Sequence, residues 1–400
     1  MRAITLYFHV HQPYRYREYS IFDVSNAQNY WDDPNYNGRT NNERIFRKVA
    51  EKSYYPGFKM LEENLAKYPG FKCSLSITGT WLDQALAWCP DLIEQIRRMV
   101  NTGRVEIVAE TYYHSLSFFY NRAEFEDQVQ MHREKIFNLF GVECKVFRNT
   151  ELAYNDELAH WAEEAGFRGI LAEGWDKILG WRSPNHVYRP AGCQSIKLLL
   201  KNYRLLDDIA FRFSDRNWPE WPLTVEKYQR WVNMDCLRGE LINLFMDFET
   251  FGEHQWADTG IFQFMNHFIY SWLKEYENKF LTVSEACDLE EPVDEVSMPW
   301  IVTWADTERD LSAWVGNAIQ DEALSTVYGM RDAILATQDA CLISDWRRLT
   351  TSDHSYAMCT KYWNDGDVHA YFSAYASPYE AFMYYMNVVR DINYRLGRAQ

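Results

Sequence analysis

The sequence lacks the cysteine patterns that hold zinc or build a disulfide framework. Its eight cysteines are scattered along 400 residues, with no CxxC pair and no tight cluster. Such spacing argues against a zinc ribbon and suits buried thiols in a reducing compartment. No apolar stretch is long enough to span a bilayer, and residues 1–8 are too short to be the apolar part of a signal peptide. We therefore expect a cytoplasmic protein that works away from membranes.

Positive charge is also scarce. The chain has 41 lysines and arginines against 57 aspartates and glutamates, and its formal net charge of −16 argues against nucleic acid as a partner. Aromatic side chains are abundant, at 16% of all residues, within a hydrophobic fraction of 47% that can fill a large core. We expect most of these rings to pack inside the protein and a minority to line a groove as flat platforms for sugar rings.

Segments rich in apolar and β-branched residues alternate with helical patterns over the first 290 residues. This alternation predicts an α/β fold with a parallel sheet, and the number of units favours a closed or nearly closed barrel over an open sheet. We expect strands at residues 3–10, 71–78, 105–109, 145–148, 169–172, 241–246 and 280–283. We expect helices at 79–86, 92–101, 123–140 and 157–165 and around 262–269, with Asp91, Asn155 and Ser284 as N-caps and Gly103 and Gly141 after helix ends.

The pattern changes after an acidic segment with a proline at residues 290–292. Beyond it, residues 309–336 and 379–396 have mainly helical patterns. We therefore predict two domains: a barrel over residues 1–290 and a C-terminal helical domain over residues 291–400.

Glu151 follows one of the expected strands and precedes the helix that Asn155 would cap, which places it in a βα loop. Carboxylates at the C-terminal ends of parallel strands are where barrel enzymes keep catalytic groups. Arg148 lies nearby in the sequence, and an adjacent cation lowers the pKa of a carboxylate, as a nucleophile requires. The alternative is an ordinary surface pair between Arg148 and Glu151.

Asp247 ends another expected strand, among large apolar side chains and close to Glu249. Burial beside Phe248 or Phe251 and the like charge of Glu249 would raise the pKa of Asp247, as a general acid near neutral pH requires. Gly252 would let the backbone turn sharply past this segment. The alternative is a strand end with solvated acids.

Two histidines, His9 and His11, close the first expected strand. Their i, i+2 spacing places both imidazoles on one face while the strand stays extended. Paired histidines can bind a metal or hydrogen-bond sugar hydroxyls. They can also be hydrogen-bonded groups at the edge of the core.

The strand expected at 105–109 leads into a polar and aromatic segment. Alternation places Glu106 and Glu110 on the same face, where either can be a structural carboxylate in a salt bridge. Tyr113 and His114, which follow, are better candidates to line a site.

Trp304 and Trp314 flank the start of the helical region and can border a groove or simply pack in a core. Glu308 and Asp310 would lie in the first turn of a helix, where acids interact favourably with the helix dipole.

Five segments resemble, in order, the motifs of glycoside hydrolase family 57, and most closely those of its α-amylase-like subgroup. The segments span nearly the whole chain and include His-Gln-Pro, Arg-Asn-Thr-Glu, Met-Asp-Phe-Glu-Thr-Phe-Gly-Glu-His and Glu-Arg-Asp-Leu-Ser-Ala-Trp. They are residues 9–13, 103–114, 147–151, 246–254 and 308–317.

The resemblance implies an incomplete TIM-like (β/α)7 barrel followed by helices that complete the substrate groove. It implies an enzyme that cleaves α-1,4-glucosidic bonds of α-glucans or maltooligosaccharides with retention of configuration. We expect this enzyme to use no cofactor and no metal. The family's nucleophile falls on Glu151 and its general acid/base on Asp247. By the same matching, His9, His11, His114, Glu249, His254, Glu308 and Asp310 would line the sugar subsites, and we expect Arg148 and Trp304 beside them.

Other functions remain compatible with the sequence. A 4-α-glucanotransferase or branching enzyme would use the same two acids, because water and a sugar compete at one glycosyl-enzyme intermediate. A metal-dependent carbohydrate hydrolase or deacetylase would need a third ligand beside His9 and His11. A non-catalytic glucan-binding homologue would be expected to have lost Glu151 or Asp247, and both are present.

Overall fold

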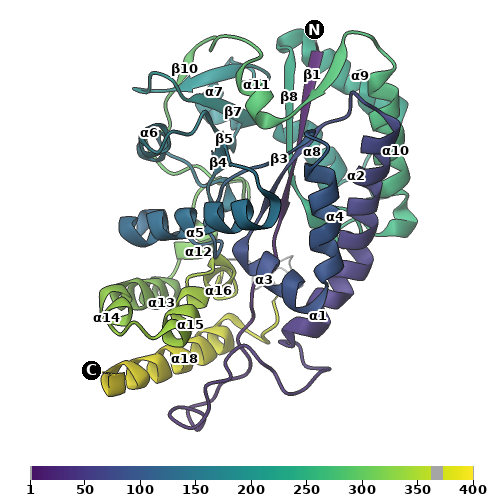
Figure 1. Cartoon of the computed structure of the whole chain (residues 1–400). Coiled ribbons are helices and arrows are strands. Elements are labelled where there is room, and N and C mark those ends of the chain that lie inside the picture. The colour runs from purple at the N-terminus through teal and green to yellow at the C-terminus, as the bar shows by residue number, and fades with distance from the viewer. Residues whose placement is uncertain (1, 362–372, 400) are drawn as a thin grey trace.

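The long strand β1 (Arg2–Val10) lies at the centre of the molecule and pairs with three other strands in the computed structural model (Figure 1). Along one edge it pairs parallel with β8 (Leu241–Asp247), in a register that sets His9 opposite Asp247. Its first residues also pair with β9 (Asn278–Leu281), and its last residues pair with β2 (Cys73–Ile77). The structure describes residues 2–361 and 373–399.

Parallel strands continue from β1 around an incomplete barrel. The sheet passes from β2 to β3 (Val105–Ile107), and a second sheet runs from β4 (Val146–Arg148) to β5 (Gly169–Glu173) and β7 (Lys197–Lys201). At one seam the Ala109 N–H donates to the Val146 carbonyl at 2.9 Å, and the Arg148 N–H donates to the Ala109 carbonyl. At the other seam the Asn202 N–H donates to the Asn243 carbonyl at 2.9 Å. These few bonds join the two sheets, so the predicted (β/α)7-type fold is confirmed.

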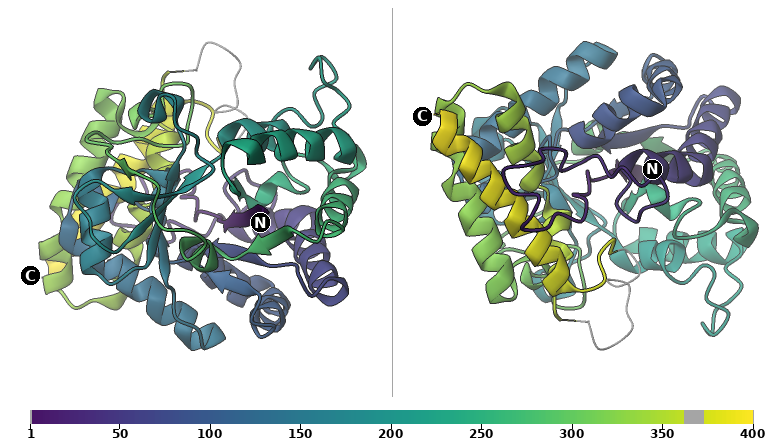
Figure 2. Two further views of the ribbon diagram at one scale, coloured as in Figure 1. Left: turned by 90° about the horizontal axis from the view of Figure 1, so that it is seen from above. Right: turned by 90° about the horizontal axis from the view of Figure 1, so that it is seen from below.

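Helices cover the outside of the strands, and two short strands extend the second sheet (Figures 1 and 2). β6 (Val187–Pro190) runs antiparallel to β7, and β10 (Glu295–Val296) pairs parallel with β6. The helices of this part are α1 (Asn42–Val49), α2 (Tyr55–Lys67), α3 (Gly79–Trp88), α4 (Pro90–Val100), α5 (Arg122–Phe140), α6 (Asp156–Glu164), α7 (Asp176–Leu179), α8 (Tyr203–Ala210), α9 (Val225–Asp235), α10 (Ile261–Leu273) and α11 (Val283–Cys287).

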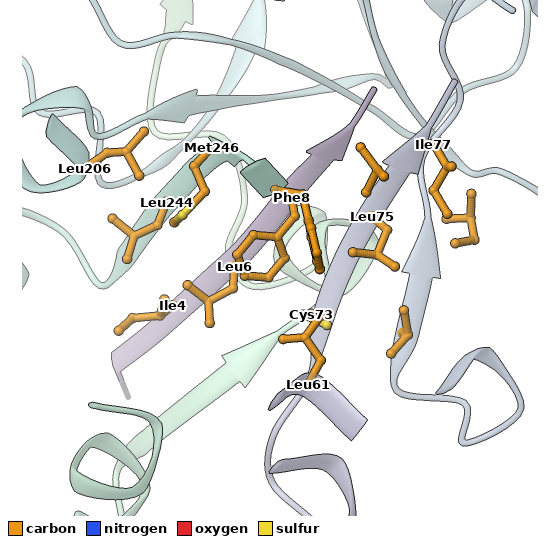
Figure 3. Close-up of a cluster of buried hydrophobic side chains, with 14 of the residues drawn as sticks. Ile4, Leu6, Phe8, Leu61, Cys73, Leu75, Ile77, Leu206, Leu244 and Met246 are labelled. Atoms are coloured by element: carbon orange, nitrogen blue, oxygen red, sulfur yellow. The ribbon is translucent and has the colours of Figure 1, made fainter. Parts of the chain in front are cut away.

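The main core lies between the strands and the helices that cover them. Ile4, Leu6 and Phe8 alternate along β1 and are fully buried, and Figure 3 shows them beside Leu75 of β2 and Met246 of β8. Each such side chain stabilises the fold by ~1.5–3 kcal/mol when it leaves water. The alternation fixes which residues of β1 face this core, and therefore places His9 on the opposite face of the strand.

The C-terminal helices have a hydrophobic core of their own, which an N-terminal segment shares. Tyr16, Tyr30 and Trp31, from the loop after β1, pack with Val327 and Trp346 in this cluster. In Figure 2 the purple N-terminal loop lies against the yellow helix α18. The helices are α12 (Ser312–Val315), α13 (Ala318–Gly329), α14 (Arg331–Ala336), α15 (Ala340–Leu349), α16 (Ser352–Tyr356) and α18 (Pro378–Ala399).

Most of the expected elements are confirmed, with ends that shift by a few residues. Asn155 caps α6 by accepting from the Leu158 N–H, and α5 ends at Gly141 in the left-handed conformation. The elements missed include α1, α2, α7, β6, β7, α8, α9, β10, α15 and α16. Of these, α1 and α8 are strongly amphipathic, so a helical period was present in the sequence and was overlooked.

Two of the predicted caps are wrong. Asp91 lies inside the first turn of α4, whose N-cap is Cys89, because Pro90 already occupies the first helical position. Thr282, rather than Ser284, caps α11, and Glu285 completes a capping box with it.

The division at residue 290 stays a prediction. Contact with the second sheet continues past that point, because Glu295 and Val296 of β10 pair with β6.

All eight cysteines carry free thiols, and Cys341 alone among them is exposed. Across residues 2–361 and 373–399, no helix combines the length and the apolar character that crossing a bilayer requires.

Replacement of Gly252 by alanine should destabilise the protein more than the same change at Gly141. Both glycines have a positive φ, but a Cβ at Gly252 would lie 1.9 Å from the Lys52 carbonyl oxygen, whereas the described neighbours of Gly141 leave it open space. We expect Gly141→Ala to lower the free energy of unfolding by about 1–2 kcal/mol through backbone strain alone. We expect about 2–4 kcal/mol for Gly252→Ala, because overpacking adds to the strain. Urea unfolding measures both variants, and equal losses would contradict this account.

Candidate active site

The carboxyl ends of β1, β4 and β8 bring the predicted catalytic residues together. The β1–β8 register sets His9 directly beside Asp247, and the His9 Nδ1 lies 3.3 Å from an Asp247 carboxylate oxygen. Glu151 follows β4 in a short 3-10 turn, Thr150–Leu152. Glu151 and Asp247 therefore both lie at the carboxyl ends of barrel strands, as expected from their positions in the sequence.

Glu151 has a hydrogen-bond donor at each carboxylate oxygen. The His114 Nε2 lies 3.0 Å from Oε1, and the Trp304 indole N–H donates to Oε2 at 2.8 Å. Burial opposes ionisation, but the bonds from His114 and Trp304 lower the pKa of Glu151 below its usual value. The result is a carboxylate fixed in one orientation and held ionised.

The backbone around this carboxylate is strained. Glu151 and Leu152 have φ of +58° and +49°, and His114 has φ of +51°. Such conformations cost ~1–3 kcal/mol each in residues with a Cβ and persist where the surroundings enforce them. Three of them at one carboxylate and its partner indicate that the geometry here is imposed by the fold.

His114 lies between two carboxylates. Its Nε2 faces Glu151, and its Nδ1 is 3.7 Å from Oε2 of the fully buried Glu110. Burial alone would lower the pKa of this imidazole, but the nearby Glu110 carboxylate and the hydrogen bond to Glu151 raise it to about 9. His114 is therefore protonated at neutral pH.

Arg148 is not the partner of Glu151, and this prediction was wrong. The Arg148 Nη1 lies 3.5 Å from Glu110 Oε2 and 3.4 Å from His9 Nε2, and its side chain is completely buried. Adjacent residues on a strand point to opposite faces, so the spacing from 148 to 151 across a turn could not show which way each side chain points. Of the two glutamates expected on one face, Glu110, which follows β3, is the buried ion-pair partner, and Glu106, within β3, accepts from the Ser284 N–H.

The predicted pKa shift of Asp247 was also wrong. Partial burial opposes its ionisation, but the hydrogen bond and charge of His9 lower the pKa of Asp247 below its usual value. Its side chain remains 41% exposed, because the neighbouring aromatic rings pack into the core away from it. The free protein therefore holds this group ionised.

Glu249 carries the raised pKa that the sequence assigned to Asp247. Burial first, and then the nearby charge of Asp247, raise the pKa of Glu249 to about 8, although the Tyr54 hydroxyl donates to it at 2.7 Å. The two acids together therefore retain one proton at neutral pH, and it resides mainly on Glu249.

His11 faces the C-terminal helices. Its Nε2 lies 2.9 Å from an oxygen of Asp353 in α16, and its Nδ1 lies 2.9 Å from the Thr78 hydroxyl. Burial, and then the charge of His114, lower the pKa of His11 to about 4, so it is a neutral donor to Asp353. Burial likewise lowers the pKa of His254, which lies in the field of Asp247. Asp353 was missed because its partner is 342 positions away and no local pattern marks it.

The last predicted motif only partly joins this cluster. Trp304 contacts Glu151 directly, whereas Glu308 lies on the surface near Lys361, which is 2.9 Å away. Asp310 accepts from the N–H and the hydroxyl of Ser312. Both acids precede helix α12, so their expected place in its first turn was wrong.

Two groups of side chains here have donor atoms close enough to share a metal ion. They are His9 with Glu110 and His114, and His11 with His114 and Asp353. In the first group the Arg148 guanidinium already faces two of the three ligand atoms, and a second cation there would be repelled. In the second group His114 Nε2 is engaged with Glu151.

The proton on Glu249 makes stability depend on pH. Because its pKa is about 8 in the folded protein and near 4.5 when unfolded, the folded state binds more protons between these values. The contribution of Glu249 to stability therefore falls as pH rises from about 4.5 to 8 and levels off above. We expect Glu249→Gln to remove this component and to gain about 2–4 kcal/mol over the parent at pH 8. Urea unfolding of both proteins from pH 5 to 9 measures it, and parallel curves would refute it.

Comparisons with known proteins identify the family and the fold. Residues 5–299 match the model of glycosyl hydrolase family 57. The chain is 40% identical over 404 residues to a Methanocaldococcus jannaschii protein named "Putative alpha-amylase", covering 98% of this chain and 84% of that protein.

Solved structures share the fold at low sequence identity. A family 57 branching enzyme from Thermococcus kodakaraensis superposes with a TM-score of 0.67 at 14% identity, over 90% of this chain and 86% of that one. The 4-alpha-glucanotransferase of Thermococcus litoralis gives a TM-score of 0.65 at 16% identity, over 88% of this chain and 56% of that longer chain. The family match over most of the chain and the 40% identical relative establish that this chain belongs to glycosyl hydrolase family 57.

Proposed function

We propose that this chain is a retaining, α-amylase-like enzyme that cleaves α-1,4-glucosidic bonds of α-glucans or maltooligosaccharides. Glu151 is the nucleophile and Asp247 the general acid/base. The observation that carries the proposal is the Glu151 carboxylate, ionised and bonded at both oxygens, in the same cluster as a half-exposed Asp247. The name of the 40% identical relative supports the substrate class.

In the first step Glu151 attacks the anomeric carbon while Asp247 protonates the departing glycosidic oxygen. His114 and Trp304 keep the attacking carboxylate ionised and aimed. A retaining mechanism needs the two carboxyls roughly 5–5.5 Å apart.

Asp247 must be protonated before it can act as an acid. A sugar that covers its exposed side chain removes water and raises the pKa of Asp247, which draws the shared proton from Glu249. Asp247 then activates the water that hydrolyses the glycosyl-enzyme and regains a proton.

His9 orients Asp247 through a 3.3 Å contact, and in this proposal His11, Glu249 and His254 contact the bound sugar. Glu308 and Asp310, with the C-terminal helices, are proposed to contact the rest of the glucan. The scattered cysteines suit a cytoplasmic location, which we include in the proposal.

Transfer to a sugar is the second candidate activity. A glucanotransferase and a branching enzyme share this fold, and a maltooligosaccharide acceptor can replace water at the same intermediate. Product analysis on amylose and maltooligosaccharides distinguishes the two: shorter chains alone indicate hydrolysis, whereas longer or branched products indicate transfer.

Replacement of either proposed catalytic acid should remove turnover. We expect Glu151→Ala and Asp247→Ala to lower kcat on amylose by at least about 10²–10⁴-fold. Azide should partly rescue Glu151→Ala and give an inverted glycosyl azide, because azide replaces the nucleophile while Asp247 still protonates the leaving oxygen. In Asp247→Ala azide should give a retained glycosyl azide only from an activated aryl maltoside, whose leaving group departs without protonation and so allows the intermediate to form. Glu157→Ala, at an exposed surface pair with Arg122, is the matched control and should keep parental activity. Full activity in either catalytic variant would overturn the assignment.

Chelation should leave the activity unchanged. The Arg148 guanidinium supplies the positive charge beside His9 and Glu110 that a metal would otherwise provide. We therefore expect full turnover after exhaustive treatment with EDTA and a chelator of softer metals, measured by reducing-sugar release. Loss of activity that zinc or another divalent ion restores would favour the metal-dependent hydrolase instead.

A further inference from the structure

The indole that holds the proposed nucleophile belongs to a loop outside the family match. Trp304 lies in the segment 303–311, between the barrel and α12, and the match ends at residue 299. This loop touches Glu151 twice: the Trp304 indole N–H donates to Oε2 at 2.8 Å, and the Trp304 backbone N–H donates to the Glu151 carbonyl at 3.3 Å. The orientation of the Glu151 carboxylate therefore depends on the contacts that hold this loop in place.

A buried ion pair between Arg309 and Glu173 holds the loop 303–311 in place. The Arg309 Nη1 donates to Glu173 Oε2 at 2.8 Å and to the Trp304 carbonyl at 2.8 Å. Glu173 is the last residue of β5 and is completely buried, and the Lys201 ammonium at the end of β7 lies 3.3 Å from the same oxygen. The Glu173 carboxylate therefore binds both Lys201 and Arg309. Arg309 also donates to the Trp304 carbonyl.

The loop is closed around this anchor and under backbone strain. The Thr303 N–H donates to the Arg309 carbonyl at 2.9 Å, and both Arg309 and Asp306 have a positive φ. Lys201 and Arg148 lie 5.2 and 5.4 Å from the Trp304 ring centroid. Strained residues persist where the surroundings over-determine them, and here the surroundings are the ion pair with Glu173.

We propose that Arg309 and Glu173 are positioning residues that act through Trp304 to keep the Glu151 carboxylate aimed and ionised. The role of Glu151 as a nucleophile rests on the proposed function, but the chain of contacts from Glu173 to Glu151 does not. The alternative is that the ion pair only joins the barrel to the helical region, in which case its loss would lower stability without changing Glu151.

The direct test follows the Trp304 indole N–H by NMR, without substrate. Trp304→Phe identifies its resonance among those of the 16 tryptophans. In Arg309→Met we expect the hydrogen exchange of this N–H at pH 7 to accelerate at least about tenfold, because the bond to a charged acceptor is weakened. Unchanged exchange would overturn the proposal.

A matched control separates positioning from general destabilisation. Arg395 forms a comparably buried ion pair with Asp345, with 11% and 17% of the side chains exposed, among the C-terminal helices. Arg395→Met should lower the melting temperature and leave the exchange of the Trp304 N–H unchanged. If Arg309→Met does not fold, Glu173→Gln, which keeps a hydrogen-bond acceptor for Arg309, should show a smaller acceleration, and no acceleration would overturn the proposal.

Kinetics give the second readout. In Arg309→Met and in Trp304→Phe we expect the acidic limb of the kcat/KM profile on maltooligosaccharides to move to higher pH by about one unit, with KM little changed. The double variant should show no further shift, because both changes act on the same hydrogen bond, from the Trp304 indole to Glu151. An unmoved limb in Arg309→Met would contradict the proposal. A parent protein without glucan activity would refute the proposed function and leave the exchange experiment to decide the role of Arg309.

Discussion

The candidate site depends on one buried negative charge, the carboxylate of Glu110. It has no solvent exposure and lies against His9, His114 and Arg148. Burial opposes its ionisation, yet these neighbours hold its pKa well below the usual range. An isolated charge at this depth would cost several kcal/mol, so Glu110 and its partners form one unit in which each group requires the others.

This unit reaches both proposed catalytic acids. Glu110 helps to keep His114 protonated, and the imidazolium in turn keeps Glu151 ionised. Through the same carboxylate oxygen Glu110 also contacts His9, which contacts Asp247. The buried Glu110 thus acts on both proposed catalytic acids, in each case through a histidine. The asymmetry between them comes from their remaining partners: Trp304 at Glu151, and solvent and Glu249 at Asp247.

The C-terminal region completes this arrangement. Trp304 donates to Glu151, and Asp353 from α16 bonds to His11 on the other side of the cluster. The N-terminal loop packs in the same cluster as the C-terminal helices, with Tyr16 and Trp31 in their core. The ends of the chain are therefore joined around the mouth of the barrel, and residues far apart in sequence can meet there with fixed geometry.

The sequence by itself determined the alternation of strands and helices, the strand ends that carry His9, Glu151 and Asp247, and the family. These follow from local periodicity and from motifs, which need no knowledge of distant contacts. Only the tertiary structure decided the charge states. Arg148 faces Glu110 rather than Glu151, and the raised pKa belongs to Glu249 rather than Asp247. A pKa depends on burial and on the charges within a few ångströms, and neither quantity is encoded in sequence spacing.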